Sequence, residues 1–355
     1  MINAAILERL TDAIAKRGGG APAIKCQPFY DVLNELFTEA EAELAIQLPA
    51  EAMTASQIAK CTGRQDGREL RDMLESMAEK GLLLADEPGE NATYKLLPLL
   101  PGILEFQFLK GGTGPRDRKI ILLIHEYLKY VNKLASEMPR DAGANTKKKT
   151  IHLDELVSQI AVIYSYDEAL NLINKFDDIA VGNCLCRHRG EITGKPCDKP
   201  KDVCMIVGPE AKPAAARGMV KLINKEEARK VLDRAEAAGL VHSSMYHQGG
   251  FIEFLCNCCS CHCSTLRGIK RSPAPSEAAI THQVIHVDQE TCIGCGECVP
   301  RCQTGAIMME GEAVRLNEIR CIGCGLCRYA CPADALKLVK REGIWSNLPV
   351  WQWQS

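Results

Sequence analysis

Eight cysteines near the end of the chain form two runs with the same internal spacing. The runs are Cys292-x2-Cys295-x2-Cys298-x3-Cys302 and Cys321-x2-Cys324-x2-Cys327-x3-Cys331. A [4Fe–4S] cluster presents one iron to each of four thiolates, and a short loop with two residues between cysteines wraps three of its corners. Gly294 and Gly323 lie inside these loops and allow the tight turns that such wrapping requires. The two runs therefore predict two [4Fe–4S] clusters.

The paired runs resemble the bacterial-type ferredoxins that hold two [4Fe–4S] clusters. In that family the fourth cysteine of each run binds the other cluster. The resemblance implies one cluster on Cys292, Cys295, Cys298 and Cys331, and a second on Cys321, Cys324, Cys327 and Cys302. It also implies a small α+β electron-transfer module, expected here over residues 279–341. The chain departs from the family at Gln303, where a proline usually follows the fourth cysteine, so we expect a changed local turn.

Two features inside the module bear on this interpretation. Residues 306–309 and 313–316 flank Glu310-Gly311 and predict a β-hairpin between the runs. A pair of zinc knots is the alternative to the clusters. It is disfavoured because zinc sites use separated pairs of cysteines that complete a four-ligand set.

A second field of cysteines lies upstream, within residues 181–271. Its nine members are Cys184, Cys186, Cys197, Cys204, Cys256, Cys258, Cys259, Cys261 and Cys263. Thiols this close together bind a soft metal or oxidise. Nine thiols are one more than two cubanes require, so we expect one or two further iron–sulfur clusters, with zinc, a redox-active dithiol or unligated thiols as alternatives. His188 and His262 are weaker candidate ligands because cysteines are in surplus.

The surroundings of this field carry a modest positive charge and a second resemblance. The basic side chains suited to balancing anionic clusters are Arg187, Arg189, Lys195 and Arg267. The patterns Cys-x-Cys-Arg-His, Cys-Asp-x-Pro and Cys-Asn-Cys-Cys-x-x-Cys, with Leu266-Arg267-Gly268 following, resemble a family of larger bacterial and archaeal 4Fe–4S dicluster proteins. The isolated Cys26 and Cys61 are expected to be buried structural thiols.

The rest of the chain predicts mostly helical structure, and the fold class expected for the whole is α+β. Residues 1–110 read as helices followed by a two-stranded wing, an order that resembles a winged-helix domain. Thr54 is the expected N-cap of one helix, and residues 66–79 form the next. Residues 115–180 are expected to be a helical segment, and Asn224 to cap a helix over 225–238. Residues 111–115 and 272–276 read as linkers. Residues 342–355 form a tail with all three tryptophans, Trp345, Trp351 and Trp353, which suits either an interface anchor or packing onto the module.

Charge and missing motifs narrow the function. Residues 1–110 hold 11 Lys and Arg against 17 Asp and Glu, a net charge of −6, so nucleic-acid binding is disfavoured. The sequence shows no secretion signal and no run of about 18 apolar residues, so a cytoplasmic protein without a membrane span is expected. It also shows no P-loop and no dinucleotide-binding glycine pattern.

These observations favour an iron–sulfur electron-transfer protein or subunit that exchanges single electrons with a partner oxidoreductase. Two alternatives stay open at this point. The first is an enzyme with its chemistry at a cluster in the cysteine-rich region. The second is a redox-sensing winged-helix regulator, which the charge weakens.

Overall fold

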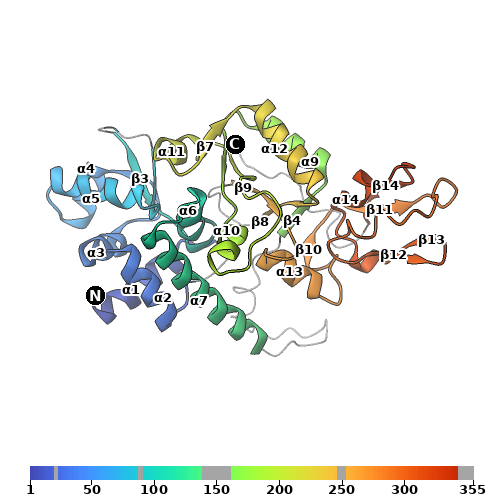
Figure 1. Ribbon diagram of the computed structural model, residues 1–355. Helices are drawn as coiled ribbons and strands as arrows, with labels where there is room; N and C mark the ends of the chain where they lie inside the picture. The colour runs from blue at the N-terminus through green and yellow to red at the C-terminus, as the bar shows by residue number, and fades with distance from the viewer. Residues whose placement is uncertain (20–22, 87–88, 90, 138–160, 246–252, 343–355) are drawn as a thin grey trace.

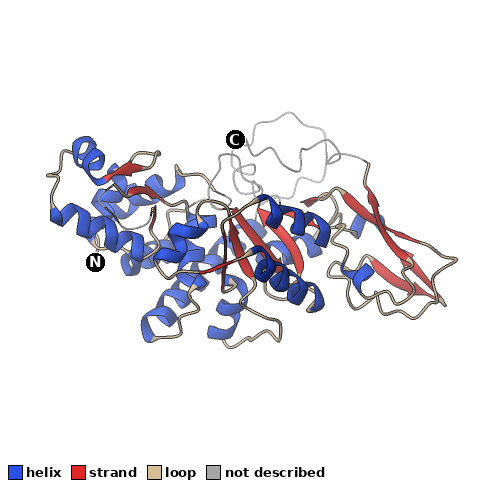
Figure 2. Cartoon of the chain, turned by 90° about the horizontal axis from the view of Figure 1, so that it is seen from above, coloured by secondary structure: helices blue, strands red, loops and turns tan. Residues whose placement is uncertain are grey.

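The protein is built of three parts arranged in a row. The computed structural model describes residues 1–19, 23–86, 89, 91–137, 161–245 and 253–342. Figures 1 and 2 both show a helical N-terminal part at one end, a large sheet in the middle, and the C-terminal module at the opposite end. The tail with its three tryptophans, and residues 138–160 of the expected helical segment, lie outside the described residues.

The N-terminal part is mainly helical. Its helices are α1 (Ala4–Ala15), α2 (Gln27–Leu36), α3 (Glu39–Gln47), α4 (Ala55–Thr62), α5 (Arg68–Glu79), α6 (Leu104–Leu109) and α7 (Pro115–Glu137), with a distorted turn η1 (Leu99–Ile103) before α6. Its strands are β1 (Met53–Thr54), β2 (Leu83–Ala85) and β3 (Thr93–Leu96), in the order β1-β3-β2. The predicted cap is confirmed, since the Thr54 hydroxyl accepts from the N–H of Gln57. The two strands expected after these helices are confirmed as β2 and β3, and β1 adds a third strand that is too short, at two residues, to be predicted from the sequence.

The middle part is a seven-stranded sheet in the order β10-β4-β8-β9-β6-β5-β7. The strands are β4 (Ala161–Tyr164), β5 (Ile179–Gly182), β6 (Cys204–Val207), β7 (Lys221–Ile223), β8 (Val241–Met245), β9 (Glu253–Cys258) and β10 (Ala279–Ile280). The helices are α9 (Tyr166–Lys175), α10 (Leu185–Ile192), α11 (Ala211–Ala216), α12 (Lys225–Ala237) and α13 (Ser264–Arg271). Neighbouring strands are antiparallel except for the parallel pair β10 and β4.

Helices cover both faces of this sheet. Along β4, Val162 and Tyr164 pack into the core formed with α9 and α12, whereas Ala161 and Ile163 pack into the core beneath α13. Figure 1 shows α9 and α12 above the sheet and α10 and α13 below it. The prediction that residues 115–180 are helical throughout is wrong at β4 and at the start of β5. Both faces of β4 are buried, so its residues do not show the alternation of apolar and polar side chains that would have indicated a strand.

The C-terminal module consists of two strand pairs and short helical turns. Its elements are β11 (Gln283–Val287), β12 (Ile307–Glu310), β13 (Ala313–Leu316), η2 (Glu318–Arg320), α14 (Leu326–Tyr329) and β14 (Leu336–Lys340). Strand β11 pairs with β14, and the predicted hairpin is confirmed as β12 and β13. The linker expected at residues 272–276 is instead packed, because Ser276 is buried and its N–H donates to the carbonyl of Ile319.

Arginine side chains fasten the module to the middle part. The guanidinium of Arg301 donates to the carbonyls of Glu236 and Ala237 at the end of α12. That of Arg320 donates to the carbonyl of Lys270 in α13. The module is therefore held on both helices that flank its attachment point. Among the helices of the described residues, none combines the length and the apolar character needed to cross a membrane.

A buried arginine joins the N-terminal part to the sheet. Arg217 follows α11, and its side chain is 3% exposed. One of its terminal nitrogens lies 3.2 Å from a carboxylate oxygen of Glu75 in α5, and the other donates to the carbonyl of Ala85 at the end of β2. A buried cation with these partners ties three elements together.

Replacing this arginine should loosen that junction. We expect Arg217→Met to lower the free energy of unfolding by about 2 to 3 kcal/mol, since the partly buried Glu75 carboxylate loses its cation. Urea unfolding followed by circular dichroism measures the change. The control is Lys230→Ala, which breaks an ion pair whose side chains are 69% and 77% exposed and should cost less than about 0.5 kcal/mol. Equal effects of the two substitutions would contradict the assignment.

Candidate iron–sulfur sites and thiol clusters

Four cysteines line a cavity inside the C-terminal module. They are Cys292, Cys295 and Cys298 from the first run and Cys331 from the second. Apolar side chains of β13 and β14, Val314 and Leu336, close the cavity. The N–H of Ala335 donates to the Cys331 sulfur over 3.3 Å, so the backbone already presents a donor to a ligand atom.

The other four cysteines of the runs line a second cavity. They are Cys321, Cys324 and Cys327 from the second run and Cys302 from the first. The N–H of Ala306 donates to the Cys302 sulfur over 3.1 Å, the counterpart of the contact in the first cavity. Each run thus contributes three cysteines to one cavity and its last cysteine to the other, the same grouping as the crossed ligand sets.

Glycines are necessary in both loops. Gly294 and Gly323 have φ angles of +67° and +65°. A Cβ atom on Gly294 would lie 2.3 Å from the carbonyl oxygen of Glu312, and one on Gly323 would lie 2.1 Å from that of Gln283. Backbone oxygens cannot withdraw from such a contact, so only glycine lets each loop close around its cavity.

Burial disfavours the deprotonated form of these thiols unless a metal ion is bound to them. Burial raises the pKa of Cys324 and of Cys327 well above the usual value, and it raises the pKa of Cys298 and of Cys321 as well. A thiolate therefore forms in these cavities only when a cation balances it. Iron supplies that charge, so the donor set and its surroundings fit a cluster.

Gln303, the departure from the ferredoxin pattern, has a contact role. Its side-chain oxygen accepts from the N–H of Ser260 over 3.1 Å, and its side-chain nitrogen donates to the carbonyl of Gly239 over 3.0 Å. A proline offers neither group. The residue next to Cys302 therefore joins the module to the cysteine-rich turn before α13.

The nine upstream cysteines separate into a group of six and a group of three. The six form a closed series in which each thiol interacts electrostatically with two others, in the order Cys184, Cys186, Cys263, Cys258, Cys256, Cys204 and back to Cys184. We call this group the thiol ring. The remaining three, Cys197, Cys259 and Cys261, interact with one another and lie beside His262.

The pairing of strands assembles the thiol ring. Cys204 opens β6, and Cys256 lies on β9 one position beyond the pair formed by Met205 and Leu255. Cys258 ends the same strand, on the same face as Cys256 because side chains alternate. Two helix starts complete the ring, since Cys184 precedes α10, Cys186 lies in the first turn of that helix, and the Cys263 sulfur accepts from the first turn of α13.

The ring is strongly polarised. The adjacent thiols of Cys186 and Cys204 hold the pKa of Cys184 well below its usual range. The thiol of Cys256 lowers the pKa of Cys258, at the opposite corner, to about 6. The thiol of Cys184 in turn raises the pKa of Cys186. Neighbouring thiols therefore stabilise a thiolate at Cys184 and at Cys258, two opposite positions in the ring.

A fully buried arginine lies against this charge. Arg187 is 1% exposed. Burial opposes its charged form, yet the negative charge of Cys184 and Cys204 raises its pKa above the usual value. One nitrogen donates to the carbonyl of Asn257, whereas Nε and Nη2 are buried and have no hydrogen-bond partner within the described residues. Unpaired buried donors are costly, so they indicate an anionic group at the ring. A thiolate-bound cluster is such a group.

Asn257 explains the asparagine in the Cys-Asn-Cys-Cys pattern. The side chain is fully buried and bonds on both sides: its oxygen contacts Nδ1 of His242, and its nitrogen donates to the carbonyl of Val203, next to Cys204. His242 continues through Nε2 to Glu236, 3.0 Å away. This network was not evident from the sequence, because its members come from α12, β8 and β9.

The thiol ring and the second cavity of the module share one apolar core. Cys263 is buried in a cluster with Ile322 and Leu326, and Cys186, Cys258 and Cys324 pack against the same cluster. Ile322 and Leu326 flank Cys324, which lines the second cavity. The two sulfur sites are therefore neighbours through protein that excludes water.

Three of the other expected residues lie apart from these sites. His188 is buried, and its Nε2 lies 2.9 Å from the carbonyl of Gly112, in a segment expected to be a linker. Cys26 is buried as predicted. The prediction for Cys61 is wrong: its thiol is exposed, because it lies on the solvent side of the last turn of α4.

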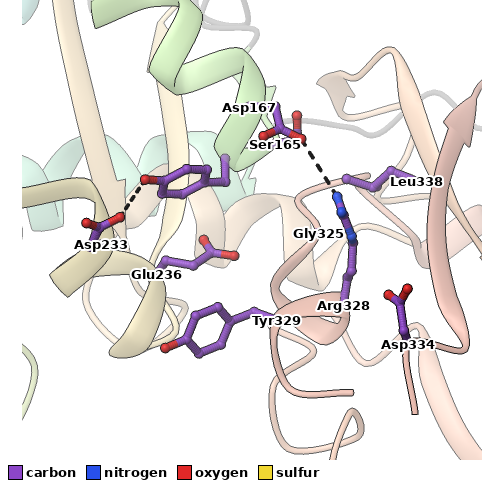
Figure 3. A pocket seen from close by; sticks show the side chains of 10 residues that line it. Ser165, Asp167, Asp233, Glu236, Gly325, Arg328, Tyr329, Asp334 and Leu338 are labelled. Carbon is purple, nitrogen blue, oxygen red and sulfur yellow. Dashed lines mark hydrogen bonds and ion pairs between the residues drawn. The ribbon is translucent and has the colours of Figure 1, made fainter. Parts of the chain in front are cut away.

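A solvent-open pocket marks the seam between the module and the sheet (Figure 3). On the sheet side, the Tyr166 hydroxyl donates to the Asp233 carboxylate. On the module side, Arg328 lies 3.7 Å from Asp167. The pocket is lined by no cysteine, so it belongs to the attachment of the module and not to the sulfur sites.

Two cavities, each lined by four cysteines, are the arrangement of an iron–sulfur module with two cluster sites. Comparison with known proteins agrees: residues 285–338 match the family model of the 4Fe-4S dicluster domain. No curated protein and no solved structure matches the chain. The chain therefore contains a 4Fe-4S dicluster domain, and this domain together with the many cysteines indicates an iron–sulfur electron-transfer role.

The asparagine network gives a prediction about stability. We expect Asn257→Ala to lower the free energy of unfolding by about 2 to 4 kcal/mol, because His242 and the Val203 carbonyl lose their buried partner. Urea unfolding of the two proteins measures it. Asn132→Ala, on the exposed side of α7, is the matched control and should change the free energy by less than about 0.5 kcal/mol. An Asn257→Ala protein as stable as the control would refute the role of the network.

Proposed function

We propose that this protein transfers single electrons between a partner oxidoreductase and its own chain of iron–sulfur clusters. This series of clusters consists of two [4Fe–4S] clusters in the module and one further cluster in the thiol ring. The observation that carries the proposal is the shared apolar core between the ring and the second cavity, in which Cys263 and Cys324 both pack. Electrons pass between clusters through such packed protein without any substrate pocket.

The chain's own residues prepare each site for that role. A bound cluster supplies one-electron redox chemistry. The N–H groups of Ala306 and Ala335 donate to ligand sulfurs, and such donors make reduction easier because they stabilise added negative charge. Arg187 does the same beside the ring. Apolar side chains exclude water from the second cavity, which is lined by Ile285, Ile307 and Ile322.

The first cavity is the proposed contact with the partner. Its Cys295 is exposed, and the neighbouring Ile293 is 68% exposed. Met309 is 37% exposed, and it lies beside the first loop, because a Cβ atom added to Gly296 would be 3.6 Å from the Met309 sulfur. A partner that covers Ile293 and Met309 buries apolar surface and brings its own redox centre to the outermost cluster.

The N-terminal part is proposed to be a winged-helix-like protein-docking domain. The order α3, β1, α4, α5, β2, β3 is that of a winged helix. Two of the basic side chains around α5 already pair with acids: Arg71 lies 2.8 Å from Asp66, and Lys80 lies 2.7 Å from Glu41. Because these cations are engaged and the part is acidic overall, docking to a protein is favoured over binding to DNA.

The crossed ligand sets can be tested by iron content. Cys302→Ala, in protein purified without oxygen, should lose about four irons, and the double variant with Cys321→Ala should lose no more, because both cysteines line the same cavity. The double variant with Cys292→Ala should lose about eight, because that cysteine lines the other cavity. EPR of the reduced proteins counts the remaining clusters. If the pair with Cys292 loses only about four irons, the runs are not crossed.

The thiol-ring cluster can be tested through its arginine. Arg187→Met should lower the iron content by about four and reduce the electrons taken up in a redox titration from about three to about two per chain. Arg68→Met, which removes a side chain in α5 that is 92% exposed, is the control and should keep all of the iron. Full iron and three electrons in the Arg187 variant would contradict the proposal, and two electrons in the unchanged protein would remove the third cluster from it.

A further inference from the structure

Three cysteines and a histidine next to the thiol ring form a separate group. The ligand atoms of Cys197, Cys259, Cys261 and His262 all lie within 4.8 Å of one another. Cys197 belongs to the loop between α10 and β6, whereas the other three lie in the turn between β9 and α13. Two stretches of chain that are distant in sequence thus converge on one point.

The separation of the sulfurs decides how many metal ions the group suits. The sulfurs of Cys197 and Cys261 are 3.7 Å apart. Zinc–sulfur bonds of about 2.3 Å in a tetrahedron place neighbouring sulfurs about 3.8 Å apart. A cubane binds each thiolate to a different iron and so spreads its sulfurs farther apart, whereas the four ligand atoms of this group all lie within 4.8 Å of one another. The spacing therefore suits a single tetrahedral ion.

The imidazole is oriented as a ligand. Nε2 of His262 lies 2.8 Å from the carbonyl oxygen of Lys195, so this nitrogen carries the proton and donates it. Nδ1 is then the atom with the free lone pair, and it is buried with no hydrogen-bond partner among the described residues. Metal-bound histidines show this arrangement, in which one nitrogen binds the ion and the other donates to a carbonyl.

Packing holds the ring of His262 in this position. A Cβ atom on Gly190 would lie 2.4 Å from Cδ2 and 2.6 Å from Nε2 of the imidazole. Gly190 is therefore needed for His262 to reach the carbonyl of Lys195. On the other side, a guanidinium nitrogen of Arg187 lies 3.9 Å from the Cys259 sulfur. Three thiolates, a neutral imidazole and a divalent ion sum to a charge of −1, and Arg187, which also faces the thiol ring, supplies positive charge beside this group.

We propose that Cys197, Cys259, Cys261 and His262 bind one zinc ion in a closed, structural site. Sulfur donors with one imidazole nitrogen are a common zinc set, and four protein ligands leave no position for a substrate. The ion fastens the loop after α10 to the turn after β9. Helix α10 carries Cys186 of the thiol ring, and β9 carries Cys256 and Cys258. The same turn contains Ser260, which bonds to Gln303 of the module. The zinc site therefore fixes the ring and the module relative to each other.

Zinc content and its coordination test the proposal on the full chain. Protein purified without oxygen should hold about one zinc per chain, and zinc-edge X-ray absorption should show about three sulfurs at roughly 2.3 Å and one nitrogen at roughly 2.0 Å. His262→Ala should lose the zinc, whereas His262→Cys should retain it with a fourth sulfur. Cys61→Ala, which removes an exposed thiol elsewhere, should leave zinc content unchanged.

The possible results are distinct from those for the clusters. In the His262→Ala protein the eight irons of the module should remain, so the proposed electron-transfer function can hold even if zinc is absent. Zinc absent from the unchanged protein, or four sulfurs around it, would overturn the proposal. So would loss of iron in place of zinc in Cys197→Ala, because the group would then be part of a cluster.

Discussion

Buried sulfur that binds a metal carries negative charge, and the structure depends on balancing that charge where water is excluded. In the module the balance comes from iron and from backbone donors, the N–H groups of Ala306 and Ala335. Around the thiol ring it comes from a guanidinium, since Arg187 is buried with its charge directed at the sulfurs. An unbalanced thiolate in either place would be neutralised by a proton and would no longer hold a metal. The charged partners are therefore as essential as the cysteines.

The seven-stranded sheet is the frame that makes the thiol ring possible. Cys204 and Cys256 lie far apart in the sequence and become neighbours because β6 pairs with β9. Helices supply the remaining corners at their starts, where Cys184 and Cys263 lie. Antiparallel pairing is rigid in register, so the sulfurs are held in place before any metal arrives. A preformed site loses little entropy when it binds its cofactor.

The junction between the sheet and the module is equally specific. Gln303 bonds to Ser260 and Gly239, Arg301 bonds to the end of α12, and Ile322 and Leu326 fill the apolar core that the ring shares. A ferredoxin module that acted alone would need none of these contacts. They turn the module into the outer end of a longer arrangement of sulfur sites, and they explain why this chain differs from the simple pattern at the residue after Cys302.

The sequence by itself determined the dicluster module. Each loop places three cysteines and its glycines within a few residues, so their spacing alone predicts a site for a [4Fe–4S] cluster. Local signals also determined the capped helices α4 and α12 and the hairpin of β12 and β13. Only the tertiary structure decided how the nine upstream cysteines divide, that His262 belongs with three of them, and that β4 and β5 are strands. The reason is physical: these groupings arise from pairing between distant strands, and no local spacing encodes which distant segments will meet.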